Sequence, residues 1–172
     1  RGVFRFLDRR LADHEFLAGA TYSVADILLL CGMDFAAKLN DPARTVVCFA
    51  GDGDFQMTCQ ELATAAQYGA QPIILILNNG IYGTIRAHQE RHYPTRVSGT
   101  DMVVNPDFSA LAQAYGFHGE RVERTEDFAA AFERALASKT GAVLDLNISP
   151  EALTPRVSLS QMREAALKAG KG

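Results

Sequence analysis

The sequence predicts an α/β fold, a parallel β-sheet with flanking helices, preceded by a short all-helical segment. Three short apolar runs, at 45–50, 72–77 and 142–148, are rich in β-branched residues and show little polar alternation. Such runs are typical of parallel strands that are buried on both faces. Amphipathic segments separate the runs. The alternation of strand and helix therefore predicts one layered α/β domain.

The first 39 residues have helical periodicity throughout, and the pattern changes after Asn40, Asp41 and Pro42. We therefore expect a domain boundary here, with a helical segment at 1–39 and the α/β domain at 40–172. A weaker strand is expected at 119–123, which would be the fourth of the sheet.

The helices expected in the α/β domain are at 55–68, 106–115, 126–138 and, as a short amphipathic helix with a Lys/Gly tail, 158–172. Pro106 suits the first turn of its helix. Thr125 is the expected N-cap of the third helix, and Gly69, Gly116 and Gly141 mark helix ends.

The composition is that of a globular protein: 172 residues, 48% hydrophobic and 22% charged, with a net charge of −3. This charge provides no general attraction to nucleic acid or to an anionic membrane, so neither is an expected partner. The longest apolar stretch, 24–33, contains Asp26 and is shorter than the roughly 20 residues that a membrane span needs. Three cysteines without C-x-x-C spacing argue against a disulfide framework or a zinc site and favour a reducing cytoplasm. The sequence shows no signal peptide, and its start without Met suggests a fragment.

Two short polar motifs follow two neighbouring predicted strands. Gly51-Asp52-Gly53 comes directly after the first strand, and Asn78-Asn79 comes directly after the second. Because the carboxyl ends of parallel strands lie on one edge of a sheet, the motifs should converge there. Carboxylate and amide oxygens suit Mg²⁺, while glycines allow close approach of the backbone to a ligand and the next helix offers amide donors to phosphate. The spacing thus indicates a magnesium and phosphate site.

These two motifs resemble the diphosphate-binding signature of thiamine diphosphate (TPP) enzymes. The surrounding sequence, VVCFAGDGDFQMTCQELATAAQYGAQPIILILNNGIYGTIR and then NPDFSALAQAYGFHG, is similar to the acetolactate synthase, benzoylformate decarboxylase and pyruvate decarboxylase superfamily, over about residues 40–169. By this resemblance, Asp52, Asn79 and the main-chain carbonyl of Ile81 would bind Mg²⁺, and Gly51, Gly53 and Asp54 would contact the diphosphate.

The resemblance implies the TPP- and Mg²⁺-binding domain of a 2-oxo acid decarboxylase or carboligase, that is, a lyase or transferase acting on a 2-oxo acid and working as an oligomer. In such enzymes the glutamate that activates the cofactor lies on a separate pyrimidine-binding domain, here expected on another chain. We therefore expect no turnover by this chain alone and assign it no catalytic residue. The alternative is a non-catalytic fusion or fragment with a scaffold role.

Two further patterns have more than one interpretation. Residues 1–39 resemble the carboxyl-terminal helical domain of glutathione transferases, with Ser23 and Asp26 as an N-cap pair. A glutathione transferase-like function is disfavoured because the thioredoxin-like domain is missing. His88 and His92 have the spacing of a zinc-binding helix but lack the H-E-x-x-H order, so a solvated helix face is the preferred interpretation.

Overall fold

The structure is a computed structural model that describes residues 45–154 and 156–171. The helical segment expected at 1–39, with its Ser23 cap, and the expected boundary near residue 40 lie outside the described residues. Among the described helices, none is long and apolar enough to cross a membrane.

The four predicted strands are confirmed, and they form one fully parallel sheet in the order β1-β2-β4-β3. The strands are β1 (Val47–Gly51), β2 (Ile73–Asn78), β3 (His118–Val122) and β4 (Ala142–Asn147). The central strands are the most buried, with Ile76 and Val143 fully inaccessible. The edge strand β3 is polar along most of its length, which explains its weaker sequence signal.

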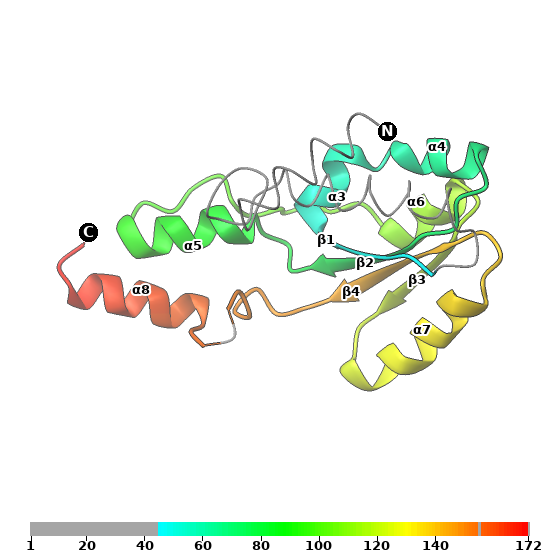
Figure 1. The fold of residues 1–172 in the computed structure, drawn as a ribbon. Coiled ribbons are helices and arrows are strands. Elements are labelled where there is room, and N and C mark those ends of the chain that lie inside the picture. The colour runs from blue at the N-terminus through cyan, green and yellow to red at the C-terminus, as the bar shows by residue number, and fades with distance from the viewer. Residues whose placement is uncertain (1–44, 155, 172) are drawn as a thin grey trace, which may run out of the picture.

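Helices cover both faces of this sheet (Figure 1). The helical elements are α3 (Asp52–Thr58), α4 (Glu61–Gln67), α5 (Gly83–His92), α6 (Phe108–Ala114), the 3₁₀ turn η1 (Thr125–Asp127), α7 (Phe128–Ala137) and α8 (Leu159–Lys168). Helices α3, α4 and α6 lie on one face, and α7 lies on the other. Helices α5 and α8 pack together beyond the carboxyl ends of the strands.

Each face of the sheet has its own apolar core. On the first face, the rings of Phe55 from α3 and Phe108 from α6 meet edge to face, with centroids 5.6 Å apart. On the other face, Ala131 and Ala135 of α7 pack against Leu144 and its neighbours. Small residues on α7 allow that helix to lie close to the sheet. The two cores hold the strand ends in fixed positions.

Three of the predicted helix limits are wrong in detail. The helix expected at 55–68 is two helices, α3 and α4, and α3 already begins at Asp52. Pro106 precedes the helix rather than occupying its first turn, because the Asp107 side chain is the N-cap and accepts from the Ala110 amide at 2.9 Å. Thr125 is not an N-cap: it starts η1, and α7 begins at Phe128 without a side-chain cap.

The helix predicted at 158–172 is confirmed as α8. Helix α8 begins with a complete capping box, in which the Ser158 hydroxyl accepts from the Gln161 amide and the Gln161 side chain accepts from the Ser158 amide. Its partner α5 was expected as the helix carrying the two histidines, although the predicted order of strands and helices omitted it.

Candidate functional site

Asp52 lies at the carboxyl end of β1, where Gly51 ends the strand and Asp52 opens α3. Its side chain is buried, with the residue only 2% exposed. One carboxylate oxygen, Oδ2, accepts two hydrogen bonds, from the Gly80 amide at 3.0 Å and from Asn105 Nδ2 at 2.7 Å. The first of these bonds ties the loop after β2 to the end of β1. The structure therefore brings the two strand ends together, as the spacing of the motifs predicts.

The loop that follows β2 is restrained by hydrogen bonds within the loop and to residues 100–102. Asn79 Oδ1 accepts from the Ile81 amide at 3.0 Å, and Gly80 has a positive φ of 67°, which glycine adopts without strain. The Met102 amide donates to the Gly80 carbonyl at 2.8 Å, and Ile81 forms an antiparallel bridge with Asp101. The Asn79 side chain and the Ile81 carbonyl thus sit in a fixed loop next to Asp52.

Gly53 is required by a neighbouring side chain. A Cβ built at Gly53 would lie 2.7 and 2.9 Å from two carbon atoms of the Tyr82 ring, which is closer than real contacts allow. At Gly51 a Cβ would meet the Asp54 carboxylate at 3.0 Å. The structure thus explains Gly53 by packing against Tyr82, and it places Asp54, which is partly buried, beside Gly51.

A chain of amides extends from Asp52 into the sheet. Asn105 Nδ2 donates to Asp52 and also to Asn78 Oδ1 at 3.1 Å, and Asn78 Nδ2 donates to Asp145 Oδ1 at 2.8 Å. Gln56 completes the set by donating to Asn105 Oδ1 at 3.0 Å. Asp145 is 1% exposed, and its burial raises its pKa, an effect that the Asn78 hydrogen bond opposes.

Sequence reasoning missed this network, although one signal for it was present. Asp145 interrupts the apolar run of the strand predicted at 142–148, and a carboxylate in a strand buried on both faces needs a polar partner. No sequence pattern pointed to Asn105. It is carried by the long loop between α5 and α6, and only the fold returns that loop to the end of β1.

The oxygen atoms of the predicted set are of the chemical kinds that a magnesium ion takes as ligands. No group of three His, Cys, Asp or Glu residues suited to a metal occurs in the described chain. The candidate set instead combines one carboxylate, one amide oxygen and one peptide carbonyl, which are hard ligands that Mg²⁺ accepts while it keeps water and phosphate oxygens. Among the described residues, no group donates a hydrogen bond to Asp52 Oδ1 or to the Ile81 carbonyl. These two oxygens thus have no donor among the described residues, whereas Asn79 Oδ1 already accepts from the Ile81 amide.

The other candidate features do not form a second site. His88 and His92 are both exposed on α5, with their rings stacked 6.3 Å apart, so the described residues support the solvated helix face rather than zinc. Arg86 on the same helix pairs with both Glu90 and Asp101.

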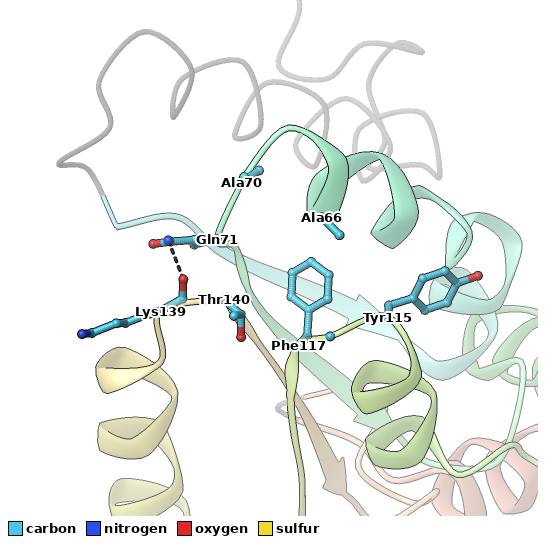
Figure 2. Close-up of a pocket in the computed structure, with 9 residues that line it drawn as sticks. Ala66, Ala70, Gln71, Tyr115, Phe117, Lys139 and Thr140 are labelled. Atoms are coloured by element: carbon cyan, nitrogen blue, oxygen red, sulfur yellow. Dashed lines mark hydrogen bonds between the residues drawn. The ribbon is translucent and has the colours of Figure 1, made fainter.

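A cavity of about 270 Å³ lies at the opposite, amino-terminal edge of the sheet (Figure 2). Phe117 and Tyr115 line it together with Lys139, whose main-chain carbonyl accepts from Gln71 Nε2 at 2.6 Å. None of the predicted site residues lines the cavity, so it is separate from the carboxyl ends of β1 and β2, where Asp52 lies (hereafter the Asp52 edge).

Comparison with known proteins identifies the family. The sequence model described as "Thiamine pyrophosphate enzyme, C-terminal TPP binding domain" matches residues 31–146, starting ahead of the boundary expected near residue 40. The chain is 39% identical over 112 residues to the acetolactate synthase large subunit of Haemophilus influenzae, covering 64% of this chain and 20% of that protein. It is 37% identical over 112 residues to the isozyme 2 large subunit of Escherichia coli, covering 65% and 20%.

A solved structure gives the same result. The thiamine diphosphate-dependent 4-hydroxybenzoylformate decarboxylase of Rhodococcus jostii RHA1 aligns with a TM-score of 0.59 and 33% identity, over 67% of this chain and 22% of that one. The chain thus spans about a fifth of the length of these relatives. From the family match and the parallel sheet together, we conclude that the chain belongs to the C-terminal TPP-binding domains of acetolactate synthase-like thiamine diphosphate enzymes.

Proposed function

We propose that the carboxyl edge of β1 and β2 binds Mg²⁺ and the diphosphate of TPP. Asp52, Asn79 and the Ile81 carbonyl hold the ion, while Gly51, Gly53 and Asp54 face the diphosphate. The observation that carries this proposal is the hydrogen bond from the Gly80 amide to Asp52 Oδ2. It fixes the loop of Asn79 and Ile81 against Asp52 while leaving Oδ1 without a protein donor in the described structure.

The magnesium ion would also offset the negative charges of Asp52 and the diphosphate. Asp52 is a buried carboxylate, and a diphosphate brought next to it would add negative charge that the neutral amides around Asp52 cannot offset. A divalent cation between them removes this repulsion. TPP binding should therefore depend on magnesium.

Isothermal titration calorimetry of TPP into the full chain, with magnesium and with EDTA, tests the proposal. We expect binding only with magnesium, and we expect Asp52→Ala and Asn79→Ala to lose it, because each removes one hard oxygen from the ion. Asn147→Ala is the matched control, since Asn147 is an exposed amide that ends the neighbouring strand β4. Equal TPP affinity in EDTA, or unchanged affinity in either site variant, would refute the proposal.

We further propose that the whole enzyme is a 2-oxo acid decarboxylase or carboligase, in which this domain works with a pyrimidine-binding domain of another chain in an oligomer. When bound, TPP supplies an electron sink for cleaving or forming a bond next to a carbonyl. The residues at the Asp52 edge bind and orient the diphosphate end. None of Asp52, Asn79 and the glycines is assigned to polarise the aminopyrimidine.

Hydrogen-deuterium exchange at C2 of TPP, followed by NMR, tests this division of roles. With the chain and magnesium alone, we expect exchange no faster than in free TPP, together with no decarboxylation of pyruvate or benzoylformate. Addition of a pyrimidine-domain partner should accelerate exchange. Fast exchange by the chain alone would show that it contains its own activating group and would contradict the proposed partner.

A further inference from the structure

Asn105 occupies the junction between the Asp52 edge and the buried strand β4. Both hydrogens of its amide nitrogen are used, one toward Asp52 Oδ2 at 2.7 Å and one toward Asn78 Oδ1 at 3.1 Å. Its oxygen accepts from Gln56 Nε2 at 3.0 Å. Both N–H groups of the Asn105 amide and its oxygen therefore have partners in this orientation. Turning the amide over would place its oxygen against the acceptor oxygens of Asp52 and Asn78.

The direction of this network is fixed from its buried end. Asp145 Oδ1 accepts from Asn78, so the Asn78 amide nitrogen faces β4 and its oxygen faces Asn105. An acceptor facing Asn105 requires a donor in return. The Asn105 nitrogen, rather than its oxygen, is thus turned toward Asp52.

This orientation determines which oxygen of Asp52 stays available. Oδ2 receives Asn105 and the Gly80 amide, while Oδ1 receives no hydrogen bond from the described residues. Two donors on one oxygen restrain rotation of the carboxylate, because turning it would break both bonds. A carboxylate that is already oriented loses less conformational freedom when it takes up an ion.

We propose that Asn105 is a positioning residue, held by Asn78 and Asp145, that orients the Asp52 carboxylate so that Oδ1 faces the magnesium ion. The inference rests on the proposed function, since it assigns Asp52 to the ion. Asn105 touches neither the ion nor TPP in this assignment. Its effect is on magnesium affinity, through Asp52.

The test uses the full chain and titrates TPP at a series of magnesium concentrations, which separates the magnesium Kd from the TPP Kd at saturating magnesium. Asn105→Ala removes the donor, and Asn105→Leu removes it while keeping the size of the side chain. We expect both to raise the magnesium Kd by about tenfold or more, as is usual when a residue that orients a metal ligand is lost. At saturating magnesium, both variants should bind TPP with the same affinity as the unmodified chain.

Gln113→Ala is the matched control, because Gln113 is an exposed amide on α6 that donates to the Gly119 carbonyl, away from Asp52. Urea unfolding without metal checks that each variant is folded, which is expected because Asn105 is a partly exposed loop residue. An unchanged magnesium Kd in both Asn105 variants would overturn the inference. So would a loss of TPP affinity that saturating magnesium does not restore, which would indicate a packing role.

The Asp52→Ala variant, measured in the same series, separates the two proposals. If Asp52→Ala binds magnesium and TPP like the unmodified chain, the proposed function itself fails. If Asp52→Ala loses magnesium while the Asn105 variants keep it, only the role of Asn105 is refuted. A loss in both, with rescue by magnesium only in the Asn105 variants, is the result that supports both.

Discussion

Two regions of the domain each bury a carboxylate, but one carboxylate has cationic partners and the other has neutral ones. Glu90 of α5 is fully inaccessible and pairs with two guanidinium groups, Arg86 on its own helix and Arg163 on α8. Asp52 is almost as buried, but its partners are neutral, the Gly80 amide and the Asn105 side chain. The charge of Glu90 is thus satisfied within the protein. The charge of Asp52 has no cationic partner among the described residues, as the proposed magnesium site requires.

Removal of Glu90 should give the largest change in stability. Glu90→Ala leaves Arg86 and Arg163 without their shared partner, and we expect the free energy of unfolding to fall by about 3 kcal/mol, as for other broken buried pairs. Urea denaturation measures the change. The control is Glu133→Ala, an exposed glutamate on α7, which should change stability by less than about 0.5 kcal/mol. Equal effects of the two substitutions would show that the α5–α8 ion pairs contribute nothing.

A smaller effect is expected at the start of α8, in the same region as Glu90. Ser158→Ala removes the hydroxyl that accepts from the Gln161 amide, and losing such a cap costs about 1 kcal/mol. Ser158→Asp keeps an acceptor at the cap and should retain most of the stability. Urea denaturation of both variants checks this, and an equal loss in both would point to packing rather than capping.

The two regions should also differ in their response to acid. Hydrogen bonding to Arg163 lowers the pKa of Glu90 below 4.5, so the stability that it provides is present above 4.5 and is lost as the pH falls through its folded pKa. Burial raises the pKa of Asp145 above 3.8, so its contribution has the opposite sign: stability is lost as the pH rises through the folded pKa.

Asp145→Asn should remove that second contribution. The variant keeps an oxygen to accept from Asn78 but carries no charge, so its stability relative to the unmodified chain should increase as the pH rises from below 3.8 toward neutrality. Urea denaturation across this range measures the difference. A difference that is independent of pH would show that the Asp145 pKa is not raised by folding.

The smallest change in stability should accompany the largest change in binding. Asp52→Asn keeps an oxygen for Gly80 and Asn105 and removes a buried charge, so we expect the unfolding free energy without metal to change by less than about 1 kcal/mol. Magnesium-dependent TPP binding should nevertheless be lost. A large loss of stability in metal-free buffer would place Asp52 with Glu90 as a structural acid and would remove the contrast between the two regions.

The sequence was sufficient for the sheet and for the main motif. Strands β1, β2 and β4 could be predicted because buried parallel strands leave apolar runs, whereas the polar edge strand β3 gave only a weaker signal. The convergence of Asp52 with the loop after β2 follows from parallel topology alone. The start of α7 could not be predicted, because Thr125 has the chemistry of a cap but begins a 3₁₀ turn instead. Asn105 was also beyond prediction, since its partners lie in α3 and β2 and only the folded loop brings them into contact.

The strand order β1-β2-β4-β3 also constrains how the chain can fold during synthesis. Strand β2 pairs with β1, which precedes it closely, but its second neighbour is β4, with Ile73 beside Ala142. A growing chain that has emerged only as far as α7 therefore presents one edge of the apolar strand β2 without a partner. Such an edge can pair with another chain, so we expect the nascent domain to be open to aggregation until β4, which ends at Asn147, can pair with β2.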